Sequence, residues 1–109
     1  MAKNKYFAKK TTVGGMKYDS KGEANRHQEL KIMERVGDIT QLQHQVKFEI
    51  IPKIGKQRAA NYIADFVYYD KNGVKIVEDF KGMSTAEYKL KKKLMLFRHG
   101  ISITETGRR

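Results

Sequence analysis

The stretch NYIADFVYYDKNGVKIVEDFKG, residues 61–82, contains two apolar runs separated by a turn sequence. Residues 61–69 and 74–81 are rich in aromatic and β-branched side chains, which is typical of β-strands. Between them, Asn72-Gly73 favours a tight turn because both positions accept a positive φ. The stretch therefore predicts an antiparallel β-hairpin.

Each of these predicted strands carries an acidic residue among apolar ones, Asp65 in the first and Asp79 in the second. A buried carboxylate without a partner is unfavourable, so such residues call for an explanation. Because side chains alternate along a strand, Asp79 and Lys81 share a face, whereas Glu78, an alternative ligand, points to the other. We predict that the hairpin brings Asp65 beside Asp79.

Two converging carboxylates need a cation between them, or one must take up a proton. Mg²⁺ or Mn²⁺, which prefer oxygen ligands, would suit such a pair. We predict a metal site formed by Asp65, Asp79 and Glu23, the last of these near the start of a predicted helix. Such an ion can polarise a phosphate oxygen and lower the pKa of bound water. Lys81 would place an ammonium group near the reacting phosphate.

The flanking sequence predicts further elements with recognisable ends. The expected elements are a short hairpin or ordered arm within residues 1–17, a helix from Ser20 to Val36, a strand over 39–51, a helix from Ser84 or Thr85 to Gly100, a strand over 101–104 and a tail over 106–109. Residues 18–105 would form one core. The order helix, three antiparallel strands, helix, strand predicts an α/β fold with a mixed sheet flanked by helices.

The composition favours an anionic partner. Among 109 residues, 23 are Lys or Arg and 12 are Asp or Glu, giving a net charge of +11. This excess attracts polyanions, and nucleic acid is the leading candidate. No apolar run is long enough for a membrane span, and no cysteine is present to form disulfides. We expect a cytoplasmic protein of a bacterial or phage-infected bacterial cell, with no membrane partner and no small-molecule cofactor.

The acidic and basic motifs resemble those of the PD-(D/E)XK nuclease superfamily, with its restriction-endonuclease-like core. The matching stretches are residues 18–24, 62–66, 77–82 and 88–93. Glu23 corresponds to the acidic residue of the first helix, Asp65 to that of the second strand, and Asp79 with Lys81 to the acidic-x-Lys motif. Ala64 stands where the motif has proline. More narrowly, the chain resembles a small phage-encoded family of poorly defined function.

The resemblance implies a divalent-metal-dependent DNA endonuclease that acts as a homodimer. Holliday-junction or other branched DNA, in phage recombination or packaging, is the favoured substrate. A duplex-nicking endonuclease, a non-catalytic DNA-binding accessory protein and an RNA-directed module are the alternatives. The predicted DNA-binding residues are Lys9, Lys10, Lys53, Lys56, Arg58, Lys89 and Lys92.

Several residues also have structural interpretations. Glu23 follows Ser20 at capping-box spacing, so its role could be to cap the helix alone. Capping and metal binding can also share one helix end. Gln43 and Gln45 would face solvent, or contact phosphate or water near the metal. His27 is expected at the edge of the core, and His44 and His99 at the surface. The tyrosines Tyr62, Tyr68 and Tyr69 are expected to pack rather than to stack on bases.

Overall fold

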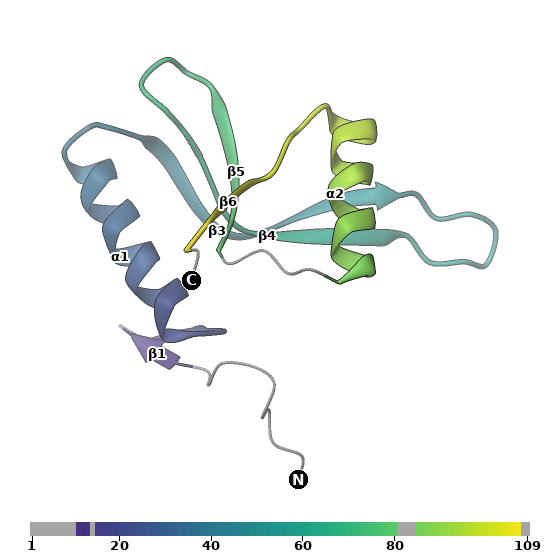
Figure 1. The fold of residues 1–109 in the computed structure, drawn as a ribbon, viewed down its shortest axis with the longest axis horizontal. Coiled ribbons are helices and arrows are strands. Elements are labelled where there is room, and N and C mark those ends of the chain that lie inside the picture. Colours follow the sequence, from purple (N-terminus) through teal and green to yellow (C-terminus); the bar gives the residue numbers. More distant parts are fainter. Residues whose placement is uncertain (1–10, 14, 81–84, 108–109) are drawn as a thin grey trace, which may run out of the picture.

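The computed structural model describes residues 11–13, 15–80 and 85–107, which form a twisted sheet with two helices beside it (Figure 1). The elements in chain order are β1 (Thr11–Val13), β2 (Met16–Tyr18), α1 (Lys21–Arg35), β3 (Thr40–Ile51), β4 (Ala60–Tyr69), β5 (Lys75–Phe80), α2 (Ala86–His99) and β6 (Thr104–Thr106). The predicted order of elements is confirmed.

The main sheet has the strand order β3-β4-β5-β6. Its first three strands are antiparallel, and β6 runs parallel to β5. The predicted α/β fold with a mixed sheet is therefore confirmed. The final strand lies farther along the chain than the expected 101–104, because Ile101 and Ile103 pack against the apolar cluster under α2 instead of pairing in the ladder.

The helices begin and end at residues that satisfy free backbone groups. Ser20 caps α1 by accepting a hydrogen bond from the backbone N–H of Glu23, and Thr85 does the same for α2. Gly100 ends α2 in the left-handed conformation, with φ of 68°. Across the described ranges, no helix is both long and apolar enough to cross a bilayer.

Apolar side chains cover both faces of the sheet, and each face carries one helix. The cluster against α1 contains Leu30, Ile39, Phe66 and Tyr68. The cluster against α2 contains Ile50, Tyr62, Ala64, Val67, Val77, Tyr88 and Met95. Val77 and Tyr68 therefore meet different helices from Ile76 and Val67, their neighbours in the chain.

The alternation of side chains along β4 is broken at Asp65. Ala64 and Val67 both belong to the α2 cluster, although strict alternation would send them to opposite faces. On the neighbouring strand, Gln45 has a φ of 62°, and the ladder places it across from Asp65. A positive φ is uncommon outside glycine, and such irregularities re-aim side chains near functional sites. Both strands are thus irregular at the predicted acidic residue.

Candidate functional site

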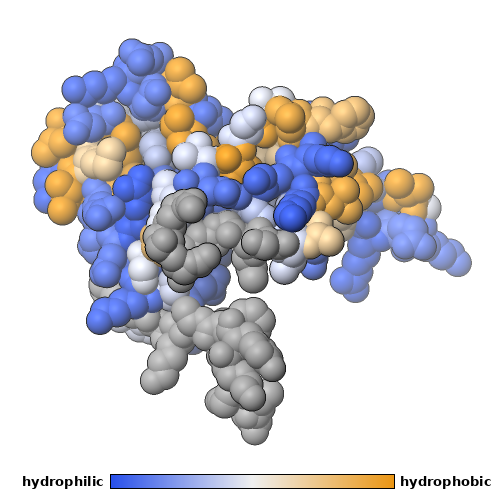
Figure 2. Space-filling view, viewed as in Figure 1, coloured by the Kyte–Doolittle hydropathy of each residue, from blue (hydrophilic) through white to orange (hydrophobic). Residues whose placement is uncertain are grey.

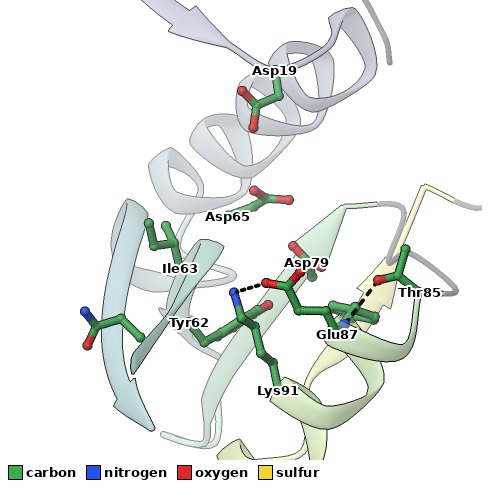
Figure 3. Close-up of a pocket in the computed structure, with 10 residues that line it drawn as sticks. Asp19, Tyr62, Ile63, Asp65, Asp79, Thr85, Glu87 and Lys91 are labelled. Atoms are coloured by element: carbon green, nitrogen blue, oxygen red, sulfur yellow. Dashed lines mark hydrogen bonds and ion pairs between the residues drawn. The ribbon is translucent and has the colours of Figure 1, made fainter. Parts of the chain in front are cut away.

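A cavity of about 370 Å³ lies where β4 and β5 meet the start of α2. Asp65 from β4 and Asp79 from β5 both line it, and Figure 3 shows them as neighbours. The ladder explains this placement, because Phe66 pairs with Glu78 and the preceding residue of β4 then faces Asp79. The backbone N–H of Phe80 donates a 2.8 Å hydrogen bond to Oδ2 of Asp65 and fixes that carboxyl.

The two carboxyl groups lie in an environment that disfavours their charged forms. Burial raises the pKa of Asp65, and the charges of Asp79 and Glu23 raise it further. Burial also raises the pKa of Asp79. The pair therefore keeps a proton at pH values where an exposed carboxyl has lost it. Like charges held together in this way favour a cation as a ligand.

Two tyrosines complete the wall beside Asp79. The Tyr62 side chain is buried, and its hydroxyl has no hydrogen-bond partner within the described residues. Burial raises the pKa of Tyr62, and the Asp79 charge raises it further, so this hydroxyl stays protonated. Tyr88 donates a 2.7 Å hydrogen bond to Oε2 of Glu105, which also accepts one from Lys92. The expectation that Tyr62 packs in the core is confirmed, but its hydroxyl also faces the acidic pair.

Glu23 forms one half of the predicted capping box, because its backbone N–H donates a 3.0 Å hydrogen bond to Oγ of Ser20. Its carboxylate bonds the residue before Ser20 and also makes further contacts. Its Oε1 accepts a hydrogen bond from the backbone N–H of Asp19 at 3.2 Å. Its Oε2 lies 3.1 Å from Nε2 of His44 and accepts a 3.4 Å hydrogen bond from Gln45. His44 and Gln45 are consecutive, and the positive φ of Gln45 lets both side chains reach one carboxylate. Glu23 is thus held by a neighbouring strand as well as by its own helix.

The expectation that His44 lies at the surface is wrong. Its side chain is only 9% exposed and stacks on the rings of His27 and Phe66. His27 is buried as expected, and its Nδ1 lies 2.7 Å from the Tyr18 hydroxyl. Burial lowers the pKa of His27 to about 4, with the neighbouring His44 adding to the shift. These rings form a packed layer behind Glu23.

The structure brings together only part of the predicted catalytic group. Asp65 and Asp79 share the cavity, and Glu23 is close enough for its charge to act on both. Within residues 11–13, 15–80 and 85–107, no group of three or more His, Cys, Asp or Glu side chains is arranged to hold a metal ion. Glu23 instead contacts His44. Lys81 lies outside the described residues.

Glu78 lies on the opposite face from Asp79, as alternation along the strand predicts. It is fully buried against α1, where Arg26 donates two hydrogen bonds to it, at 2.8 and 3.0 Å. Tyr68 and Thr106 donate one each, at 2.7 and 2.8 Å. Burial alone would raise the pKa of Glu78, but these donors outweigh it and lower the pKa. Glu78 is therefore a structural residue.

Comparison with known proteins identifies a family for this chain. Residues 3–103 match a family described as protein of unknown function (DUF1064). The chain belongs to the DUF1064 family. Neither a search of curated proteins nor a search of solved structures found a match.

The cationic residues predicted to bind DNA fall into different environments in this DUF1064 member. Lys53, Lys56 and Arg58 are exposed at the tip of the β3–β4 hairpin. Lys89 is exposed on α2, whereas Lys92 is held by Glu105 at 3.1 Å. Lys9 and Lys10 lie outside the described residues.

His99, expected at the surface, is exposed, and its Nε2 lies 2.7 Å from the backbone oxygen of Glu49. Gln43 and Gln45 are exposed, as expected for a solvent-facing strand face.

Proposed function

We propose that this protein is a divalent-metal-dependent nuclease that hydrolyses the phosphodiester bonds of DNA. One observation carries the proposal: two carboxyl groups, Asp65 and Asp79, face the same cavity from adjacent strands. No Lys or Arg side chain in the described part of the chain forms an ion pair with either of them. Acidic groups with raised pKa values that meet in a cavity without a cationic partner are typical of functional sites.

The donor set fits a hard cation. Asp65 and Asp79 supply oxygen ligands, and a cation bound between them would relieve the repulsion that helps to raise the pKa of Asp65. When bound, Mg²⁺ or Mn²⁺ supplies Lewis-acid polarisation of a phosphate oxygen and a lowered pKa for a bound water. Glu23 does not line the cavity, but its charge acts on both carboxyl groups, and it would assist from the start of α1, where Asp19 and His44 hold it.

The residues around this pair have separate proposed roles. The Phe80 N–H orients Asp65, so that its other oxygen remains directed to the cavity. Lys81, two residues after Asp79, is assigned the ammonium group that stabilises the charged phosphate. These assignments follow the PD-(D/E)XK pattern and make the chain a proposed member of that superfamily.

DNA is the proposed substrate because the chain has a net charge of +11 and exposes Lys53, Lys56 and Arg58 at the tip of the β3–β4 hairpin. Within this class, branched DNA such as a four-way junction is the first substrate to test, with a homodimer presenting two cavities. A non-catalytic DNA-binding role is the second candidate. It is supported by the contacts that already occupy Glu23.

The test is a cleavage assay on a labelled four-way junction, a nicked duplex and an intact duplex, with Mg²⁺, with Mn²⁺ and with EDTA. We expect cleavage only with metal. Asp79→Asn should lower the rate at least about 100-fold, because the lost metal ligation contributes several kcal/mol. Asp65→Asn should behave in the same way.

The matched control is Glu87→Gln, which also replaces an acid by its amide at the cavity wall. Glu87 pairs with the neighbouring Lys91 at 3.2 Å and is exposed, so its loss should leave the rate unchanged. Metal-independent DNA binding without cleavage of any substrate would favour the non-catalytic role. Cleavage that survives Asp79→Asn would exclude this cavity as the active site.

A further inference from the structure

The β3–β4 hairpin extends beyond the body of the protein. Both strands continue past α2, and their connection forms the tip at the right of Figure 1. We call residues 51–60 the arm. At its tip, Ile54 and Gln57 exchange two backbone hydrogen bonds, at 2.8 and 3.1 Å. These bonds make the arm an ordered extension of the sheet.

The arm carries positive charge that no acidic side chain in the described part of the chain pairs with. Residues 50–64 contain Lys53, Lys56 and Arg58 but no Asp or Glu. None of the three cations takes part in an ion pair within the described ranges. On α2, by comparison, Lys91 and Lys92 are paired with Glu87 and Glu105, although Lys89 and Lys93 are exposed. Unpaired cations on a projecting element are suited to an anionic partner outside the chain.

The arm also exposes apolar surface beside these charges. Ile54 is 62% exposed at the tip, and hydrophobic and hydrophilic residues lie side by side on the extension at the right of Figure 2. Apolar side chains flanked by cations recur where proteins enter a groove of duplex DNA. A second copy of this chain, with its excess of positive charge, would meet the arm with repulsion.

The root of the arm reaches the acidic cavity. Asn61 and Ile63, which follow the arm on β4, line the cavity together with Asp65. Because a strand rises about 3.4 Å per residue, the tip lies roughly 25 Å from the acidic pair. The phosphates of each DNA strand advance about 3.4 Å along the helix axis per base pair, so this distance corresponds to about seven base pairs.

We propose that the arm is a clamp for duplex DNA that grips the phosphate backbone about seven base pairs from the bond at the Asp65–Asp79 cavity. The choice of DNA and of the cut site rests on the proposed function, whereas the arm's binding role does not. The clamp sets a minimum length of duplex on one side of the site. Lys53, Lys56 and Arg58 contact phosphates, and Ile54 contacts the groove between them.

The experiment measures binding by fluorescence anisotropy in EDTA, so that cleavage does not intervene. Labelled DNA duplexes of increasing length, from about 6 to 24 base pairs, are titrated at several salt concentrations. Wild-type affinity should rise steeply once the duplex spans both the cavity and the arm. Lys53→Ala/Lys56→Ala/Arg58→Ala should lose this length dependence. Its slope of log affinity against log salt should fall by about 3, or about 0.9 for each lost phosphate contact.

The matched control removes the same charge from the other end of the molecule. Lys31→Ala/Arg35→Ala/Lys71→Ala changes the end of α1 and the β4–β5 turn, and it should keep the length dependence. Equal losses for short and long duplexes in the arm variant would overturn the clamp. So would a change in its sedimentation coefficient without a loss of DNA affinity, which would identify a contact between copies.

Two further outcomes separate the clamp from the proposed function. Tighter binding of duplex RNA than of duplex DNA of equal length would overturn the assignment to DNA. Arm-dependent binding together with no metal-dependent cleavage would retain the clamp and reject the nuclease. Metal-dependent cleavage that is independent of the arm and of duplex length would retain the nuclease and reject the clamp.

Discussion

Glu78 and Asp79 are neighbours on β5, yet their surroundings are opposite in kind. Glu78 points towards α1, where Arg26, Tyr68 and Thr106 donate four hydrogen bonds to its carboxylate. Asp79 points towards α2 and shares its cavity with a second acid, Asp65. The same strand therefore fully buries one acid among four donated hydrogen bonds and half-buries a second acid beside another carboxyl group.

The difference separates stability from function. On the α1 face, burial disfavours the charge but the donors more than offset it, so the pKa of Glu78 is lowered. On the α2 face, burial and mutual repulsion act together, so the pKa of Asp65 is raised. An uncompensated acidic pair costs folding free energy and is retained where a site requires it. Perturbing each face should therefore change stability in opposite directions.

The largest effect is expected from breaking the compensated face. Arg26→Met leaves the fully buried Glu78 carboxylate without its guanidinium partner. We expect the free energy of unfolding to fall by about 3 kcal/mol, the range for removing one partner of a buried ion pair. Urea unfolding monitored by circular dichroism at pH 7 measures this change.

The control for this variant removes both partners. Arg26→Met/Glu78→Leu eliminates the stranded charge and should recover much of the lost stability, since replacing a buried pair by apolar groups is often neutral. If the double variant is no more stable than Arg26→Met alone, packing by the arginine stem outweighs the charge. The contrast between the two faces would then need another explanation.

A smaller effect of opposite sign is expected on the α2 face. Asp65→Asn keeps the shape and can still accept the Phe80 hydrogen bond, but it removes one of the two like charges. Because the folded-state pKa of Asp65 is raised above its unfolded value, the contribution of this group to stability is greatest at low pH and is lost as pH rises. In EDTA, the free energy of unfolding of Asp65→Asn should therefore rise relative to that of wild type by about 1 kcal/mol per pH unit between pH 7 and 9.

This pH window is chosen to exclude His27. The folded-state pKa of His27 is lowered to about 4, so its protonation destabilises the fold only as pH falls below its unfolded value near 6.5. For Glu87→Gln, an exposed acid-to-amide change, the difference from wild type in the free energy of unfolding should stay constant between pH 7 and 9. A stability gap for Asp65→Asn that does not change with pH would show that the pair carries no excess proton.

The sequence predicts these faces well where alternation is regular. Period-two patterning placed Glu78 and Asp79 on opposite sides of β5, and the Asn72-Gly73 turn correctly joined β4 to β5. Helix ends followed from Ser20, Thr85 and Gly100, because capping is a local interaction. The same alternation predicts that His44 is shielded from solvent, because it is an even-numbered residue of β3 like the other less exposed side chains of that strand.

The sequence could not predict the features that depend on distant groups. The positive φ of Gln45 has no local signal, because glutamine rarely adopts it. It nevertheless lets His44 and Gln45 converge on Glu23. The partners of Glu78 are equally distant, since Arg26 lies 52 residues before it in the chain. Such contacts follow only from how α1 packs on the sheet.

The smallest effect compares one hydroxyl from each face. Tyr68 donates a 2.7 Å hydrogen bond to Glu78, whereas the buried Tyr62 hydroxyl has no partner in the described part of the chain. Tyr68→Phe should lower the free energy of unfolding by about 1 kcal/mol, because a buried carboxylate loses a donor. Tyr62→Phe should leave it unchanged or raise it by up to about 1 kcal/mol, because a desolvated, unpaired hydroxyl is removed.

The sign of the difference between these variants is more informative than either value. Both substitutions delete a single oxygen from a buried tyrosine of β4, so loss of ring packing cancels in the comparison. Thermal unfolding of both proteins in EDTA measures the difference. If Tyr62→Phe is the more damaging change, its hydroxyl already satisfies Asp79, and the α2 face is compensated much as the α1 face is. If Tyr68→Phe is the more damaging change, the Tyr62 hydroxyl does not stabilise the Asp65–Asp79 pair. A bound cation could then supply the stabilisation that the pair lacks.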